Sequence, residues 1–234
     1  MTSPALKTYC RLPCGFVLAL LISIISRSPA FAEIFDDSLL NLAVNIHQTP
    51  MQTWGPGYGI YLGKGLFITA AHVAGRSWLT KPKIAIQGHE YPTQVVKEGS
   101  FEGTDLTLLS VEERLLPMRL RLRRNALCEA APWPGEDVVT VVPEGTARSR
   151  IFPPEKLPVS VRKYSTVIAD VARTGNSGSG VFDAQRRCLL GIMSRKLSQV
   201  FNHRDTGKTE TRDIAKYFVP ASTIREFIPA GTTF

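Results

Sequence analysis

The chain has 234 residues, 44% of them hydrophobic, which is enough for one large or two small cores, and we expect one compact unit. Its formal net charge of +8 falls to +5 when residues 1–32 are set aside, because they hold three cations and no acid. So mild an excess, without a recognition motif, argues against a nucleic-acid partner. No motif implies a metal or another cofactor.

The first 32 residues have the pattern of a secretory signal peptide. Lys7 and Arg11 form a basic region, 16–25 an apolar region, and Ala30-Phe31-Ala32 a small-residue cleavage site before Glu33. The apolar region is about ten residues long, short of the roughly 20 that span a bilayer as a helix. We expect cleavage after Ala32, a secreted or periplasmic protein and no stable membrane span, with an uncleaved anchor as the alternative.

Residues 40–115 contain short apolar segments separated by Gly, Pro and Asn, a pattern typical of an antiparallel β-barrel. Six strands are predicted in this half: Leu40–Ile46, Gly59–Leu62, Leu66–Ile68, Lys83–Gln87, Thr93–Val96 and Leu106–Val111.

Residues 116–134 are predicted to be a connector between two barrels. Within it, Arg119, Arg121 and Arg123 alternate with Leu120 and Leu122 at the period of a strand. Two interpretations are open: a surface for an acidic polymer or anionic membrane, and an ordinary solvated face, which we favour.

Residues 135–220 resemble the first half in pattern. Six further strands are predicted: Val138–Val142, Val159–Val161, Thr166–Val171, Gly180–Phe182, Leu189–Met193 and Tyr217–Val219. The polar segment 195–216 either overhangs a substrate pocket or forms a surface loop. A short helix over 221–228 ends the chain. The fold class is therefore all-β, with two antiparallel six-stranded β-barrels and a short C-terminal helix.

One serine stands in a turn suited to catalysis. The segment TGNSGSGVF places Ser177 between Gly175 and Gly178, so the backbone can turn sharply, expose the hydroxyl and aim consecutive N–H groups at one point. We expect the N–H groups of Gly175 and Ser177 to form an oxyanion hole. A serine hydroxyl is a weak nucleophile unless a base accepts its proton and a further group orients that base.

The base and its orienting carboxylate are predicted from strand ends. His72 follows an apolar strand in GLFITAAHVAG, and Asp105 stands at the head of the strand in EGTDLTLLSV. The other histidines, His47, His89 and His203, lack such a context. The predicted catalytic residues are therefore His72, Asp105 and Ser177.

FITAAHV, TDLTLL and GNSGSG, in that order, resemble the three catalytic blocks of the chymotrypsin-like (trypsin-fold) serine peptidases. The separations of 33 and 72 residues are similar to those of compact bacterial members, such as glutamyl endopeptidases and the protease domain of high-temperature-requirement proteases. The resemblance covers most of residues 33–234, the predicted peptidase domain. It implies an endopeptidase that hydrolyses peptide bonds through an acyl-enzyme and acts on proteins or peptides. The 57 residues after Ser177 are needed for the second barrel, so the extra domain that drives assembly of high-temperature-requirement proteases is not expected, and we expect a monomer.

The resemblance also implies a specificity pocket and bears on the cysteines. The pocket would be walled by Val171, Arg173, Ser194 and Lys196, with Met193 adjoining.

Cys128 and Cys188 remain after processing, and an exported chain permits a disulfide between them. Relatives often carry a bridge in a similar place, and the alternative is two buried free thiols.

Two features depart from the resemblance. Asn176 precedes the nucleophile where trypsin has an aspartate, so activation by an ion pair with a new N-terminus is not expected. Met193 precedes Ser194 where glutamyl endopeptidases have a histidine, so a preference for glutamate is not supported.

Two alternative functions remain: a catalytically silent trypsin-fold binding module and a carboxylesterase. The catalytic residues of a carboxylesterase would follow the chain order Ser, Asp, His.

Overall fold

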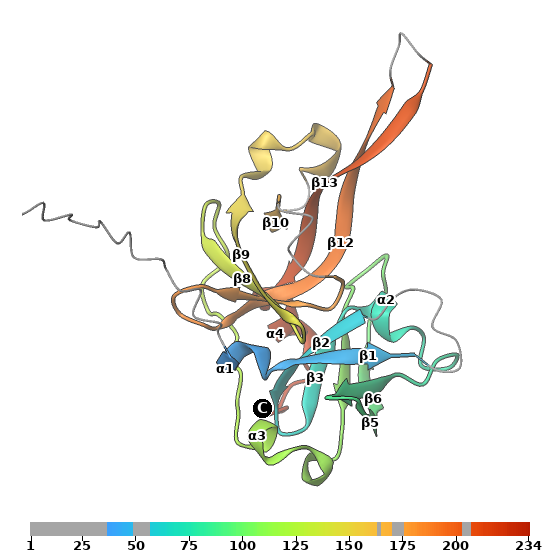
Figure 1. The fold of residues 1–234 in the computed structure, drawn as a ribbon, viewed down its shortest axis with the longest axis vertical. Helices are drawn as coiled ribbons and strands as arrows, with labels where there is room; N and C mark the ends of the chain where they lie inside the picture. Colours follow the sequence, from blue (N-terminus) through green and yellow to red (C-terminus); the bar gives the residue numbers. More distant parts are fainter. Residues whose placement is uncertain (1–36, 49–56, 163–164, 170–175, 203–206) are drawn as a thin grey trace, which may run out of the picture. The chain divides into compact units, whose positions relative to one another are not determined.

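The computed structural model describes residues 37–48, 57–162, 165–169, 176–202 and 207–234, and its N-terminal half is an antiparallel sheet (Figure 1). The sheet has seven strands in the order β5-β4-β1-β2-β3-β7-β6. These strands are β1 (Ala43–His47), β2 (Gly57–Gly63), β3 (Leu66–Thr69), β4 (Lys83–Ile86), β5 (His89–Pro92), β6 (Gln94–Glu98) and β7 (Thr107–Ser110). Every residue of β2 and β3 is buried, so these strands lie at the centre of this half.

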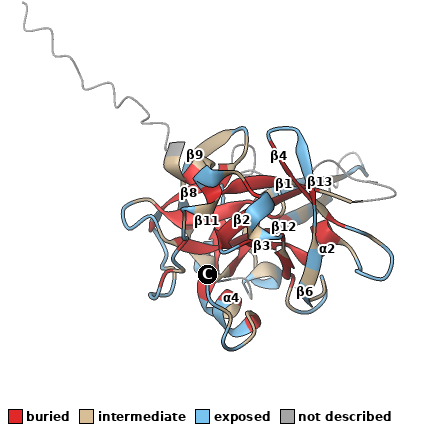
Figure 2. Ribbon diagram, turned by 90° about the horizontal axis from the view of Figure 1, so that it is seen from below, coloured by how far each residue is buried: buried red, intermediate tan, exposed pale blue. Residues whose placement is uncertain are grey.

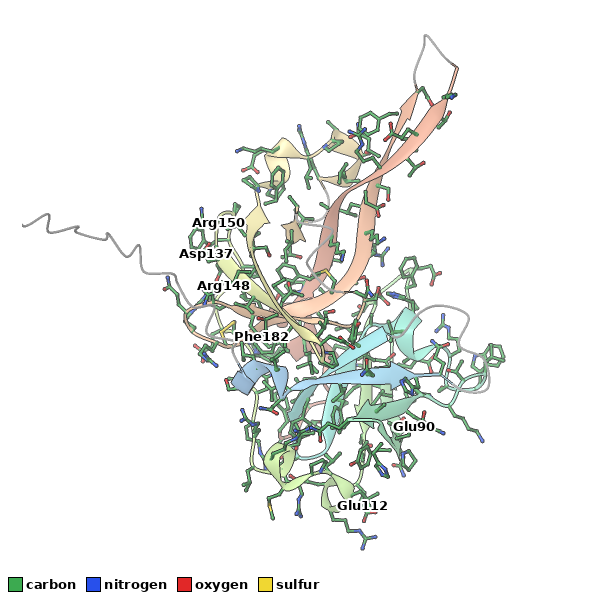
Figure 3. All side chains as sticks on the ribbon, viewed as in Figure 1. Glu90, Glu112, Asp137, Arg148, Arg150 and Phe182 are labelled. Carbon is green, nitrogen blue, oxygen red and sulfur yellow. A yellow bond between two sulfur atoms is a disulfide. The ribbon has the colours of Figure 1, made fainter. Side chains whose placement is uncertain are left out.

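The C-terminal half is a closed barrel of six strands in the order β10-β13-β12-β11-β8-β9. They are β8 (Asp137–Val142), β9 (Gly145–Phe152), β10 (Val167–Ile168), β11 (Gly180–Asp183), β12 (Leu189–Asn202) and β13 (Thr209–Pro220). On the outside of β8 and β9, exposed Asp137 and Arg150 form an ion pair of 2.5 Å (Figure 3). The all-β fold class and the six-stranded second barrel are confirmed, whereas the first half is a half-barrel sheet of seven strands where a six-stranded barrel was predicted.

Helices are short and few among the described residues. They are α1 (Asp37–Leu40), α2 (Ala71–Ala74), α3 (Met118–Arg121) and α4 (Ala221–Phe227), with single 3₁₀ turns at Glu113–Leu115, Pro154–Lys156 and Val159–Val161. The predicted C-terminal helix is confirmed as α4, which buries Ala221, Ile224 and Phe227. None of these helices is long and apolar enough to cross a bilayer.

The largest buried cluster contains residues of both halves. It joins Ile60 and Phe67 of the first sheet to Val141, Phe182 and Ile192 of the barrel. In Figure 2 the buried colour follows β1, β2 and β3 and continues into β11 and β12. The described residues from Asp37 onward accordingly belong to one compact unit.

Two hairpin strands were missing from the expectation. Gln87 and Gly88 both have positive φ, 51° and 81°, and make the two-residue turn that pairs Ile86 with His89, the first residue of β5, where no strand was predicted. β9 lies where no strand was predicted. The strand predicted at Val159–Val161 is wrong, because Pro158 precedes a 3₁₀ turn there.

Two polar segments also differ from their predicted forms. The arginine-rich segment forms the helical turn α3, with Leu120 buried and Met118 and Leu122 exposed, and not an alternating strand. The segment 195–216 belongs largely to β12 and β13, which stay paired out to Asn202 and Thr209 (Figure 1). It is therefore a long two-stranded ribbon for as far as it is described.

A disulfide joins Cys128, in the segment before the barrel, to Cys188 at the start of β12 (Figure 3). Cys128 is buried in the barrel core beside Val138, Met193 and Phe218. A bridge that closes a loop of about 60 residues restricts the unfolded chain strongly.

We expect the double variant Cys128→Ala/Cys188→Ala to unfold with a free energy about 2–4 kcal/mol lower than the wild type. Urea unfolding, with and without a thiol reductant, measures this difference. The reductant should move the midpoint of the wild type alone. Equal midpoints for oxidised wild type and variant would contradict the prediction.

Candidate active site

His72 and Asp105 are held together by three contacts. β3 ends at Thr69, and α2 then carries His72 outward, with its side chain 32% exposed. Asp105 lies just before β7 and its side chain is 1% exposed. The imidazole Nδ1 is 2.9 Å from Asp105 Oδ2 and 3.1 Å from Oδ1, and the backbone N–H of His72 donates to Oδ1 at 3.1 Å.

Ser194, which was predicted only as a residue of the specificity pocket, makes a further contact with this carboxylate. Its buried hydroxyl donates to Asp105 Oδ2 at 2.6 Å. Burial raises the pKa of Asp105, but the hydrogen bonds from His72 and Ser194 outweigh burial and lower that pKa below its usual range. Asp105 is thereby kept ionised beside the imidazole.

This lowered pKa predicts a dependence of stability on pH. The folded state binds the Asp105 proton less tightly than the unfolded chain, whose aspartates titrate near pH ~3.9. The ionised Asp105 therefore stabilises the fold above that pH, and the contribution is lost as pH falls through the folded-state pKa. The unfolding free energies of wild type and Asp105→Asn should converge below about pH 4. Urea unfolding between about pH 6 and pH 3 tests this, and a constant difference would contradict it.

The turn that carries Ser177 packs against the first sheet. The backbone N–H of Tyr58 donates to Ser177 O at 3.0 Å, and that of Gly178 donates to Met193 O at 2.8 Å. Gly178 has φ of +87°, and a Cβ there would lie 1.8 Å from Tyr58 O. Only glycine fits, because both the conformation and the space exclude a side chain.

Gly178→Ala is expected to lower the unfolding free energy by roughly 3 kcal/mol or more, through backbone strain and collision together. Gly88→Ala is the matched control, because Gly88 also has positive φ, +81°, but open space around its Cβ position. The unfolding free energy of this control should fall by only about 1 kcal/mol. Thermal unfolding of both variants measures the effect, and equal losses would mean that the contact with Tyr58 is unimportant.

The Ser177 hydroxyl donates to the main-chain oxygen of Ser194 at 2.9 Å. Within the described residues, no hydrogen bond joins Ser177 Oγ to the His72 ring. Ser194 therefore contacts both parts of the site: its hydroxyl binds Asp105 and its carbonyl oxygen binds Ser177. Asp105 and Ser177 thus both contact this buried serine, and His72 contacts Asp105.

Gly175 of the oxyanion hole and Val171 and Arg173 of the pocket lie outside the described residues, as does His203. The oxyanion hole and the pocket therefore stay predictions. Met193 packs in the barrel core, and exposed Lys196 pairs with Asp213 at 3.1 Å.

His47 and His89, the other histidines among the described residues, have partners of their own. His47 pairs with Glu90 at 2.8 Å, and the His89 ring meets the Tyr91 ring edge to face. In the described part of the chain, no three His, Cys, Asp or Glu side chains gather as metal ligands.

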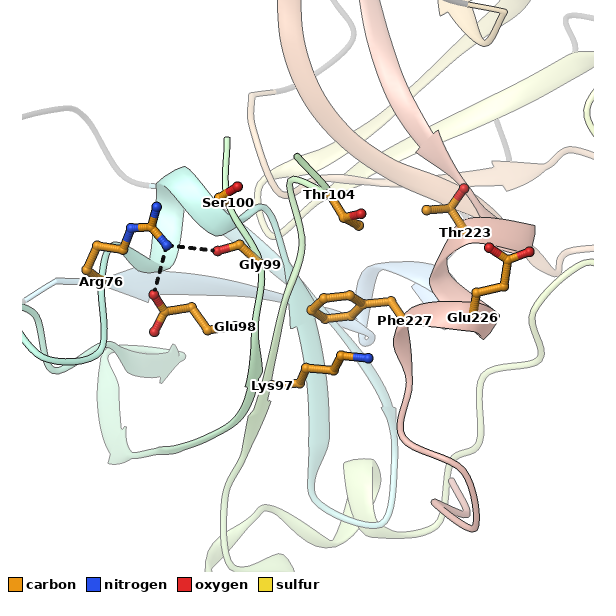
Figure 4. A pocket seen from close by; sticks show the side chains of 9 residues that line it. All are labelled: Arg76, Lys97, Glu98, Gly99, Ser100, Thr104, Thr223, Glu226 and Phe227. Carbon is orange, nitrogen blue, oxygen red and sulfur yellow. Dashed lines mark hydrogen bonds and ion pairs between the residues drawn. The ribbon is translucent and has the colours of Figure 1, made fainter. Parts of the chain in front are cut away.

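A cavity of about 500 Å³ borders the segment that leads to Asp105 (Figure 4). Its walls come from the end of β6, the segment after it, Arg76 and α4. Arg76 pairs with Glu98 at 3.3 Å, and the Lys97 ammonium lies 4.8 Å from the centre of the Phe227 ring. His72, Asp105 and Ser177 do not line it, so it is separate from the candidate active site.

A family model described as a trypsin-like peptidase domain matches residues 57–192. That range includes His72, Asp105 and Ser177. No curated protein matches the chain.

Solved structures of proteases share the fold. The active form of the Rv3671c protease from M. tuberculosis has a TM-score of 0.58 and 18% identity, covering 99% of this chain and 96% of that one. The serine endoprotease from Yersinia pestis has a TM-score of 0.54 and 16% identity, with coverages of 81% and 64%. The MamO protease domain from Magnetospirillum magneticum has a TM-score of 0.51 and 19% identity, with coverages of 82% and 98%.

Proposed function

The chain belongs to the trypsin-like peptidase family of serine-type hydrolases, and from this we propose that it is an endopeptidase using His72, Asp105 and Ser177. One observation carries the proposal: the buried Asp105 carboxylate lies 2.9 Å from the His72 ring nitrogen and accepts one hydrogen bond from the Ser194 hydroxyl. The carbonyl oxygen of Ser194 in turn accepts a hydrogen bond from the Ser177 hydroxyl. A base, its orienting carboxylate and a hydroxyl are thus linked through one serine.

The chemistry follows from the atom that each group presents. Donation of the Nδ1 proton to Asp105 leaves the Nε2 atom of His72 with a lone pair. In the proposed reaction the Ser177 hydroxyl leaves Ser194 O and turns to this base, which takes its proton as Oγ attacks the peptide carbonyl carbon. The imidazolium then protonates the leaving amine, and water attacks the resulting ester by the same general-base step.

The negative oxygen of the tetrahedral intermediate needs donors. We assign this role to the backbone N–H groups of Gly175 and Ser177, on the strength of the glycine-rich turn. Each such donor is worth about 3 kcal/mol in comparable enzymes. No metal or cofactor takes part in this mechanism, and the substrate is a protein or peptide bound by a monomer.

Labelling with a fluorophosphonate tests the proposal. The purified full chain should react with one equivalent of probe, and peptide mapping should place the phosphonyl group on Ser177. His72→Ala should abolish labelling. His89→Ala is the matched control, because His89 is exposed on β5 and away from the site, and it should label like the wild type.

A catalytically silent binding module is the second candidate. The observation that favours it is the hydrogen bond that turns the Ser177 hydroxyl toward Ser194 O. Active-site hydrogen bonds are often loose before substrate binds, so this contact is also compatible with an enzyme. A folded wild type that resists the probe would decide for the silent module.

We further propose that the protein is exported after cleavage at Ala32. The disulfide between Cys128 and Cys188 supports an oxidising compartment, and residues 1–32 have a signal-peptide pattern. N-terminal sequencing of protein from the periplasm and medium should start at Glu33. Recovery only of chains that retain Lys7 would contradict export with cleavage.

A further inference from the structure

Arg195 lies where the two halves of the fold meet at the candidate active site. It follows Ser194 on β12, while Phe101 belongs to the segment between β6 and β7. The Arg195 Nη2 atom donates to Phe101 O at 2.5 Å, and the guanidinium carbon lies 4.1 Å from the centre of the Phe101 ring. One side chain thus holds both the backbone and the ring of a residue from the other half.

The Phe101 ring in turn contacts the imidazole of His72. Their centroids are 5.2 Å apart and their planes meet at 78°, an edge-to-face arrangement. His72 is therefore bounded by Asp105 at Nδ1 and by the Phe101 ring, and Arg195 lies against that ring.

The same guanidinium also reaches the hydroxyl behind the carboxylate. Arg195 Nε donates to Ser194 Oγ at 3.4 Å, and Ser194 Oγ donates to Asp105 Oδ2 at 2.6 Å. A hydroxyl has one proton, so a donor placed at the Ser194 oxygen favours the orientation in which that proton points to Asp105. The contacts run from Arg195 through Ser194 and Asp105 to His72.

We propose that Arg195 is a positioning residue of the peptidase: it holds Phe101 against His72 and orients the Ser194 hydroxyl toward Asp105. The proposal rests on the proposed function of His72, Asp105 and Ser177. It predicts that loss of Arg195 slows the reaction of Ser177 and does not chiefly weaken the binding of substrate.

The geometry suits arginine and not lysine. The planar guanidinium stacks on Phe101 while two of its nitrogens donate in different directions. An ammonium is a single point charge, so lysine could keep the charge but not both hydrogen bonds and the stacking together. Arg195→Lys therefore separates positioning from charge alone.

The test uses diisopropyl fluorophosphate, a small probe that reacts with an activated serine without a peptide chain. Arg195→Met should lower its second-order rate constant with the full chain by about 10- to 100-fold, because displaced catalytic groups cost rates of this size. Arg195→Lys should recover only a minor part of the loss. Arg212→Met is the matched control: Arg212 also lies over an aromatic ring, Phe201 at 5.3 Å, but on the distant part of the β12–β13 ribbon, and it should react like the wild type.

Phe101→Leu gives a second variant that keeps Arg195. It should also slow the probe, and the double variant with Arg195→Met should be little slower than the slower single variant, because the two residues act as one unit. Thermal unfolding shows whether each variant is folded.

The outcomes separate this inference from the proposed function. A folded Arg195→Met variant that reacts at the wild-type rate overturns the inference, and a raised KM for peptides would then assign Arg195 to substrate binding. A wild type that does not react overturns the proposed function, and the inference falls with it. Slow reaction of Arg195→Met and Phe101→Leu, beside normal reaction of Arg212→Met, supports the inference.

Discussion

Ser177→Ala should lower kcat/KM for a peptide substrate by about 10⁴- to 10⁶-fold, the largest effect that we expect of any single substitution. Without the hydroxyl, no ester to the enzyme can form, and only binding and oxyanion stabilisation remain. The variant loses one hydrogen bond to Ser194 O and should keep its fold. A fluorogenic peptide chosen by screening a library with the wild type provides the assay.

The matched control is Ser198→Ala. Ser198 lies on the same strand as Ser194, is exposed and bonds Asp213 at 2.7 Å, outside the proposed catalytic residues. The kcat/KM of the Ser198→Ala variant should equal that of the wild type. Ser177→Ala retaining more than about a tenth of the activity would show that another group is the nucleophile.

Asp105→Asn should lower kcat by about 10⁴-fold at neutral pH. The carboxylate accepts from the His72 ring, from the His72 backbone and from Ser194. An amide can place its N–H₂ group against Nδ1, and His72 then carries its proton on Nε2, where it cannot accept the proton of Ser177. The orientation of the ring can survive while its function as a base is lost.

The control for this variant is Asp137→Asn, which removes an exposed carboxylate paired with Arg150 on the far barrel strands β8 and β9 (Figure 3). It should leave kcat unchanged. Steady-state kinetics of both variants, with thermal unfolding to establish folding, make the comparison. If Asp105→Asn stays within tenfold of the wild type, Asp105 does not fix the tautomer of His72.

Much of the site was predictable because its residues follow local rules. His72 follows a buried strand in a run of small residues, Asp105 stands at a strand head, and the glycines around Ser177 mark a sharp turn. Backbone conformation at these points depends on near neighbours, so the sequence pattern could single these residues out as candidates. The fold class could be predicted for the same reason, from short apolar segments divided by turn residues.

The secondary-structure predictions were wrong for segments whose local sequence pattern is ambiguous. β9, GTARSRIF, has little apolar alternation and forms because β8 and β10 pair with its two edges. The polar residues of β12 and β13 looked like a loop, and cross-strand pairing makes them a ribbon. The alternating Arg and Leu residues of 118–121 matched a strand, but no neighbouring strand is there to pair with them among the described residues, and they form one helical turn.

Sequence patterns predicted the side chains of the proposed chemistry, an all-β fold and a sharp glycine-rich turn around Ser177. The close approach of Tyr58 O that excludes a side chain at Gly178 is a tertiary contact. Tertiary structure alone decided that Ser194 binds both Asp105 and Ser177, and that Arg195 binds Phe101 across the two halves. The reason is physical: these contacts join residues up to 94 positions apart, and their geometry depends on the register of β12 and on how the two halves pack. No property of the neighbouring residues in the chain encodes that register locally.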